Sequence, residues 1–150
     1  MLPHFRESGG GAISAAGGSY ANDLIAGVGV HYTNRSSIGF SLSPEIGYSL
    51  EVGERPTFHA FNATLGLGLG LGGLVDLVYS PHLLVGTYGD RLGVGMRNMI
   101  GFHFFSGIFT IDLGHEFIES RGEFDNAFVG TLGLDPAVLI TQLIQGASTW

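Results

Sequence analysis

The chain has 150 residues, of which 26 are glycine and only 13% are charged, and this length predicts a single domain over residues 1–150. The net charge of −7 excludes a nucleic-acid partner, because binding to phosphates needs a basic face. The absence of cysteine excludes disulfides and thiolate chemistry. No stretch approaches the roughly 20 continuous apolar residues of a membrane helix, and the first ten residues lack the apolar core of a signal peptide.

The first two predicted strands differ in how clearly the sequence marks them. A run rich in glycine and alanine near Gly10 to Gly18 is the weakest candidate, and whether it closes a sheet is left open by its sequence. From Leu24 to Tyr32, apolar residues at even positions alternate with glycine and histidine. This alternation has the period of two that is typical of a strand with two different faces.

The third predicted strand is unusually long. From Ile38 to Val52 the chain reads IGFSLSPEIGYSLEV, in which large apolar residues alternate with Gly, Ser and Glu over 15 residues. Strands of globular proteins typically have ~5–6 residues. At ~3.3 Å per residue and ~45° tilt, this segment rises about 35 Å, which is enough to cross a bilayer.

The fourth predicted strand, from Phe61 to Leu71, alternates leucine with glycine from Leu65 onward and carries no charge. Four further segments repeat the alternation, at residues 75–86, 92–104, 109–117 and, more weakly, 124–134. Turn residues separate the segments at 34–37, 53–56, 72–73, 89–90, 106–107 and 119–123. The pattern therefore predicts eight strands over about residues 9–134.

The end of the sequence predicts a helix. Residues 135–146, DPAVLITQLIQG, begin with an Asp at the N-cap and a Pro at the first helical position, and they end with a glycine.

The composition of the two strand faces indicates which face lies on the outside of the barrel. In a soluble barrel the apolar face lies inside, and the other face must be hydrophilic; here that other face is mostly Gly and Ser, which solvate a surface poorly. In an inverted barrel the small residues fill a narrow interior and the apolar residues contact lipid. We therefore expect an all-β, eight-stranded antiparallel up-and-down transmembrane barrel. Its expected lipid-facing residues include Leu65, Leu67, Leu69, Leu71, Leu83 and Ile111.

In strand pattern and length, the chain resembles the small eight-stranded outer-membrane barrels, such as OmpX and the transmembrane domain of OmpA. Its aromatic residues are also placed like the interfacial girdles of that class, at Phe40, Tyr48, Tyr79, Phe102, Phe104, Phe109 and Phe117. The resemblance implies an outer-membrane location, a lipid bilayer or detergent as partner, and no cofactor. The short connections or the C-terminal helix are then the candidate contacts for membrane-assembly partners.

Antiparallel pairing about the predicted turns brings several polar residues together inside the barrel. One layer contains Glu45, His82, Arg97 and Glu116, and a second contains Asp76, His103 and Asp112. Arg97 is the only arginine expected to face inward along the centre of a strand, since the other five lie in tails, turns or strand ends. It is expected to pair with both Glu45 and Glu116, because buried charges need opposite partners. Three interpretations stay open: a polar plug of the lumen, an ion gate in a narrow pore, and a metal or catalytic site formed by His82, His103 and Glu116. Metal-binding spacing such as HxH is absent.

Two histidines are expected near the outer rim, at His59 and His115. Outer-membrane lipases and lipid A deacylases are barrels with Ser and His at such a rim, and Ser120 lies close to His115 in the sequence. No motif of those families surrounds these residues. The sequence therefore favours a monomeric membrane barrel with a structural or minimal-channel role, no metal and no catalysis. The alternatives are a rim-active lipid-modifying hydrolase and a soluble, lipocalin-like ligand-binding barrel.

Overall fold

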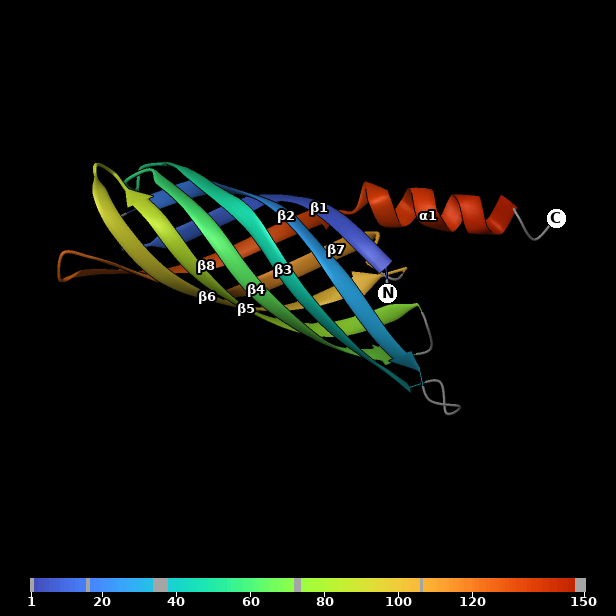
Figure 1. Cartoon of the computed structure of the whole chain (residues 1–150). Coiled ribbons are helices and arrows are strands. Elements are labelled where there is room, and N and C mark those ends of the chain that lie inside the picture. Colours follow the sequence, from blue (N-terminus) through green and yellow to red (C-terminus); the bar gives the residue numbers. More distant parts are fainter. Residues whose placement is uncertain (1, 16, 34–37, 72–73, 106, 148–150) are drawn as a thin grey trace.

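The computed structural model describes residues 2–15, 17–33, 38–71, 74–105 and 107–147. Within these ranges the elements are β1 (Leu2–Ser14), β2 (Gly17–Thr33), β3 (Ile38–Gly53), β4 (Phe58–Leu71), β5 (Val75–Tyr88), β6 (Arg91–Phe104), β7 (Phe109–Ser120), β8 (Glu123–Leu134) and α1 (Pro136–Ala147). Figure 1 shows the strands wrapped around one axis, with α1 extending beyond the end of the barrel at which β1 begins.

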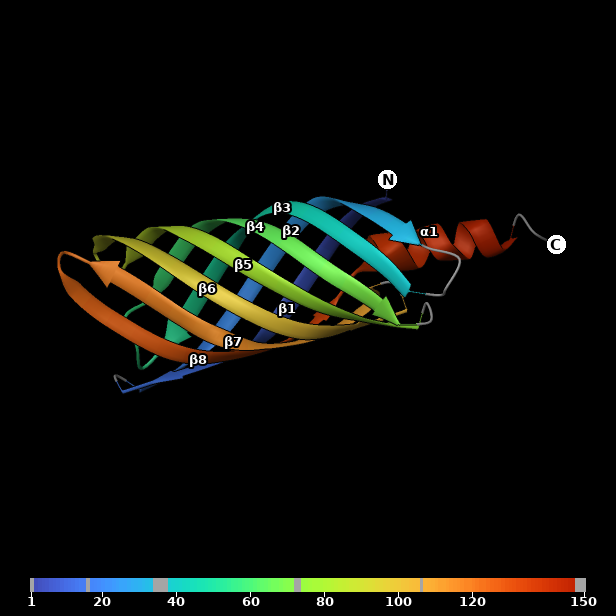
Figure 2. The same cartoon turned by 90° about the horizontal axis from the view of Figure 1, so that it is seen from below.

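The strands form a closed antiparallel barrel in which each strand pairs with its neighbours in the sequence. Closure comes from β1 and β8, which pair from Glu7 with Leu134 to Ser14 with Ala127. Figure 2, turned by 90°, shows the same single layer of strands around the lumen. The predicted eight-stranded barrel with a C-terminal helix is therefore confirmed, and its closure satisfies the backbone groups that an open edge would leave unpaired.

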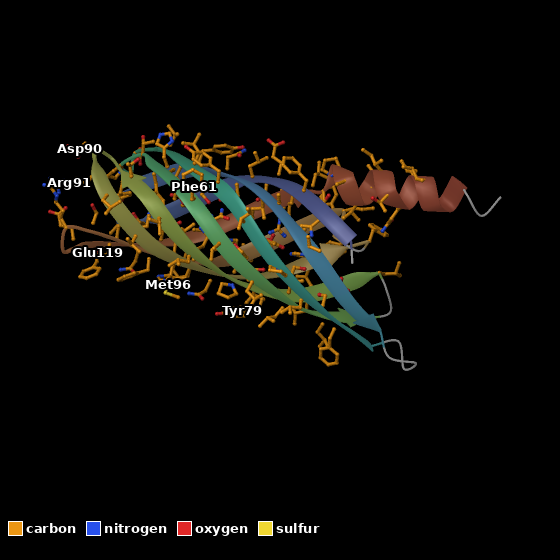
Figure 3. All side chains as sticks on the ribbon, viewed as in Figure 1. Phe61, Tyr79, Asp90, Arg91, Met96 and Glu119 are labelled. Atoms are coloured by element: carbon orange, nitrogen blue, oxygen red, sulfur yellow. The ribbon has the colours of Figure 1, made fainter. Side chains whose placement is uncertain are left out.

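The apolar face of the strands lies outside. Leu65, Leu67, Leu83 and Ile111 are 40–50% exposed, Leu69 is half-buried, and the side chain of Leu71 lies outside the described part of the structure. Phe61 is 75% exposed, and Figure 3 shows it projecting from the barrel wall, as Tyr79 and Met96 do. A soluble ligand-binding barrel would have this face inside, so the structure does not fit that alternative.

Glycine on the inner face is required by crowding. A Cβ atom at Gly68 would overlap Ser41 Oγ, and a Cβ atom at Gly86 would overlap the backbone carbonyl of His59. The Leu-Gly alternation of β4 thus combines bulky side chains outside with the smallest residue where neighbouring strands and side chains approach closely.

The first strand differs from its expected position. β1 begins at Leu2, and the run from Gly10 to Gly18 is divided between the end of β1 and the start of β2. The inner face of β1 is polar like that of the other strands, with Arg6 and Ser8 buried, but its alternation is hidden because Glu7, Gly9 and Gly11 replace large apolar residues on its outer face.

The described turns agree with the sequence signals. Arg121 and Gly122 both have positive φ (53° and 81°), as a two-residue type I′ hairpin requires. The turns expected at 34–37 and 72–73 lie outside the described residues.

The helix is fixed to the end of the barrel. Asp135 Oδ1 accepts a hydrogen bond from the backbone N–H of Val138 at 2.9 Å, which is the predicted N-cap. The Gln142 side-chain amide donates to the Phe105 carbonyl in the β6–β7 connection at 3.1 Å. Among the described residues, no helix is both long enough and apolar enough to cross a membrane.

Candidate functional site in the barrel lumen

A belt of polar residues crosses the middle of the lumen from β3 to β7. Glu45 pairs with Thr64, Thr64 with His82, His82 with Arg97, and Arg97 with Glu116. Antiparallel partners lie on the same face of the sheet, so all five side chains point inward. Thr64 Oγ1 and His82 Nδ1 are hydrogen-bonded at 2.7 Å.

Arg97 is the centre of a cluster that occupies the half of the lumen away from α1. Its guanidinium donates to Glu116 Oε2 at 2.6 and 2.9 Å, to both oxygens of Asp23 at 2.8 and 2.9 Å, and to Glu51 Oε1 at 2.6 Å. Arg97 and Glu116 have no exposed surface. Charge-assisted and bidentate bonds of this kind are the strong ones, and every nitrogen of the guanidinium is engaged.

A second arginine reaches the same carboxylates from the β3–β4 connection. Arg55 donates to Glu51 at 2.8 Å, to Glu116 at 3.1 Å and to Asp125 at 3.0 Å. Burial lowers the pKa of Arg55, but the carboxylates of Glu51 and Glu116 outweigh this effect and hold the pKa above its ordinary value. We call Asp23, Glu51, Arg55, Arg97, Glu116 and Asp125 the sealing cluster.

The sealing cluster ends at an open mouth. Tyr88 donates its hydroxyl hydrogen to Asp125 at 2.5 Å, and both residues line a cleft of about 550 Å³ together with Pro56 and Ser120. Figure 3 shows Asp90, Arg91 and Glu119 around this end of the barrel, opposite α1. The buried ion pairs therefore lie between the cleft and the rest of the lumen.

The half of the lumen near α1 contains a different set of partners. Glu45 is hydrogen-bonded to His4 Nε2 at 3.0 Å and to the Arg6 guanidinium at 3.3 Å. His103 Nε2 lies 3.1 Å from Asp112 Oδ1 and 3.5 Å from Arg6 Nη1. We call His4, Arg6, Glu45, His103 and Asp112 the vestibule cluster.

The vestibule cluster surrounds empty space. A cavity of about 60 Å³ is lined by His4, Arg6, Glu45 and His103, and by Val138 of α1. This volume has room for water molecules, which need roughly 10–15 Å³ each by this kind of measure. Arg6 Nε is buried without a hydrogen-bond partner among the described residues, so bound water would satisfy it. Asp76 faces His103 across the β5–β6 ladder and lines the same cavity.

Two expectations about the charged residues are wrong. Glu45 does not serve Arg97, because Arg97 extends toward Glu51 and Asp23, and Glu45 is taken by Arg6 and His4. Arg97 is also not the only inward arginine: Arg6 faces inward from β1, and Arg55 folds into the lumen from a connection.

The candidate catalytic and metal residues do not converge. Ser120 and His115 lie five residues apart on β7 and so on opposite faces; Ser120 Oγ donates to the Leu92 carbonyl at 2.9 Å, whereas His115 is exposed. His59, at the start of β4, is hydrogen-bonded to the Tyr48 hydroxyl at 2.6 Å. His115 instead lies near the middle of β7, so the expectation that it lies at the rim is wrong. Within the described ranges, no three His, Asp or Glu side chains form a group suited to a metal ion.

No protein-family model matches the sequence, and no curated protein matches it. A comparison with solved structures finds a similar barrel, described as "Crystal structure of the outer membrane enzyme PagL", with a TM-score of 0.63. The two sequences are 12% identical, and the match covers 87% of this chain and 98% of that chain. At this identity the likeness shows the fold, which is that of an outer-membrane barrel. The resemblance to the OmpA and OmpX class in particular stays a prediction.

Proposed function

We propose that the chain is an outer-membrane β-barrel with a structural role, whose lumen is closed to ions by the sealing cluster. The observation that supports this proposal most is the inversion of the two faces. Leucine and phenylalanine cover the outside of a closed barrel, while Arg97 and Glu116 lie fully buried inside. Such an outer surface suits hydrocarbon, and such an interior needs paired charges.

The proposal is tested by measuring which residues contact lipid. Because the chain has no cysteine, single cysteines for spin labels can be introduced at Leu67 and Leu83, with Asp90 in an exposed turn as the control. In reconstituted vesicles, we expect the first two labels to be accessible to oxygen and the control label to be accessible to a polar nickel reagent. Water accessibility at Leu67 and Leu83 would overturn the proposal.

Closure of the lumen is tested by conductance. In planar bilayers the folded wild-type protein is expected to give no resolved channel events, because the guanidinium of Arg97 is held by three carboxylates. Arg97→Ala is expected to raise ion leakage by opening the part of the lumen that the sealing cluster fills. Steady conductance of the wild type would instead support the minimal-channel alternative.

A lipid-modifying hydrolase is the second candidate, since the solved structure with the similar fold is described as an outer-membrane enzyme. For this chain the idea would require a nucleophile and a base on one face of the wall. Ser120 and His115 do not meet that requirement, because they occupy opposite faces of β7. The absence of catalysis therefore stays a prediction, and it is tested below by substituting both residues.

A further inference from the structure

Two polar residues lie side by side on the outer face of the wall. Asn98 of β6 pairs with His115 of β7 across the ladder, and His115 is exposed. Their outward neighbours are apolar and more than half exposed: Met96 (52%), Ile100 (58%) and Leu113 (66%). An amide and an imidazole thus interrupt the apolar surface that these neighbours form.

A neighbouring tyrosine fixes the orientation of the amide. The Tyr79 hydroxyl donates to Asn98 Oδ1 at 2.9 Å, so the Asn98 Nδ2 group is left to donate outward. His115 packs edge-on against Phe128 at 5.8 Å between ring centroids. Among the described residues, neither Asn98 Nδ2 nor the His115 ring has another hydrogen-bond partner.

The depth of this pair excludes lipid headgroups as natural partners. Asn98 and His115 lie near the middle of β6 (Arg91–Phe104) and β7 (Phe109–Ser120). At ~3.3 Å per residue and ~45° tilt, about 15 Å of strand rises on either side, which is half of a hydrocarbon core of ~30 Å. Lipid tails at that depth offer neither donors nor acceptors. Polar side chains in this region typically bind other protein groups.

We infer that the outer face of β6 and β7 is the contact surface for a second copy of this chain, an inference that rests on the proposed membrane location. The pair is self-complementary: a neutral His115 ring nitrogen accepts a hydrogen bond, and Asn98 Nδ2 supplies one. In a twofold dimer, Asn98 of each copy faces His115 of the other, which makes two equivalent bonds. The strand pattern alone indicated a monomer. It does not show that two outward polar residues, Asn98 and His115, lie next to each other on neighbouring strands.

The inference is tested by thiol cross-linking in vesicles at low protein-to-lipid ratio. Single cysteines at Met96 and Leu113 flank the pair, and a cysteine at Ile46, which is 72% exposed on β3 across the barrel, is the control. A short bifunctional thiol reagent is expected to give cross-linked dimers from the first two variants and monomers from the third. Equal cross-linking of all three, or monomers from all three, would overturn the inference.

A second arm tests the hydrogen bonds themselves. Asn98→Leu, combined with the cysteine at Leu113, is expected to reduce cross-linking roughly tenfold, because two hydrogen bonds worth about 0.7 kcal/mol each within a membrane are lost, and about 1.4 kcal/mol corresponds to a factor of ten. Leucine suits a lipid-facing position, so the barrel should still fold and show heat-modifiable migration in gels. Asn126→Leu is the matched control, since Asn126 is exposed near the start of β8.

The outcomes separate this inference from the proposed function. If Asn98→Leu gives as much cross-linked dimer as the variant that keeps Asn98, the proposed hydrogen bonds between Asn98 and His115 are overturned. Lipid-accessible labels at Leu67 and Leu83 together with monomers would overturn only the dimer and leave the membrane barrel standing. Water-accessible labels at those positions would remove the proposed function as well.

Discussion

The two halves of the lumen differ in how completely their charged side chains are buried and hydrogen-bonded. In the sealing cluster, Arg97 and Glu116 have no exposed surface, and the bonds to Arg97 are 2.6–2.9 Å long. In the vestibule cluster, Arg6 bonds to Glu45 at 3.3 Å beside a cavity of about 60 Å³, and its Nε lacks a partner among the described residues. One barrel therefore contains a saturated ion network whose centre is fully buried and a looser network with room for water.

The difference shows that the energetic cost of removing one charged side chain from the lumen depends on whether water can solvate the partner that remains. In the sealing cluster, deletion of the Arg97 cation leaves carboxylates that are almost completely buried, and Arg55 still contacts only two of them, Glu51 and Glu116. In the vestibule, water can enter and solvate the remaining group. Breaking a buried ion pair costs about 3–5 kcal/mol where the remaining charge stays desolvated, and less where it is hydrated. Substitutions in the two halves should therefore have unequal effects.

Arg97→Ala is expected to have the largest effect. It removes the shared cation of Asp23, Glu51 and Glu116, so the free energy of unfolding in detergent or vesicles should fall by about 3–5 kcal/mol at neutral pH. Urea titration of the folded protein measures this change. Arg91→Ala is the control, because Arg91 lies at the exposed rim and pairs with Glu123 at 3.4 Å.

Low pH should reduce the difference in unfolding free energy between the wild type and Arg97→Ala. Protonation of the carboxylates removes the attraction that stabilises the wild type and also removes the repulsion that destabilises the variant. The difference in unfolding free energy should therefore shrink as the pH falls. A constant difference down to the point of acid unfolding would show that Arg97 acts through packing rather than charge.

A double-mutant cycle sharpens the comparison further. Arg97 and Glu116 are joined at 2.6 Å, so their coupling should lie in the range of about 0.5–3 kcal/mol found for contacting pairs. Arg97 and Glu45 should couple weakly, because Glu45 is bonded to Arg6 and His4 instead. Equal couplings for the two pairs would mean that the lumen behaves as one network.

The fold was predictable because the period-two pattern gives both the strands and their faces. β4 shows this best, since leucine can only alternate with glycine over such a length where one face is crowded and the other is open. β1 was placed too late in the sequence because its outer face carries Glu7, Gly9 and Gly11 where the other strands carry large apolar residues. A strand whose outer face has few large apolar residues is thus hidden from a search for apolar alternation.

The candidate site was only partly predictable. Short hairpins fix the register, so the neighbours of Arg97 along the ladder, His82 and Glu116, follow from the turn positions. Contacts across the lumen do not follow from register. Glu51 has the inward parity of β3, but its bond to Arg97 joins strands that are not neighbours. Arg55 stands in a connection, where no periodicity exists to place its side chain.

Arg6→Ala should have a smaller effect than Arg97→Ala. The substitution removes the bond to Glu45, but the adjoining cavity can take up water, and His4 still contacts the carboxylate at 3.0 Å. We expect a loss of about 1.5–3 kcal/mol, the usual range for a hydrogen bond to a charged group. Urea titration beside Arg97→Ala measures it. A loss as large as that of Arg97→Ala would show that the vestibule is as dry as the sealing cluster.

The smallest expected effect is that of His115→Ala and Ser120→Ala on any lipid hydrolysis. The two side chains lie on opposite faces of β7, and the Ser120 hydroxyl is already bonded to the Leu92 carbonyl, so no nucleophile and base meet there. Each variant, reconstituted with phospholipid and with lipopolysaccharide, should release fatty acid at the same rate as wild type and as protein-free vesicles. The Ser120 variant can shift the stability of its strand end slightly, which urea titration separates from activity. Release by the wild type that disappears in both variants would show that the two residues act together, and it would favour the hydrolase over the structural barrel.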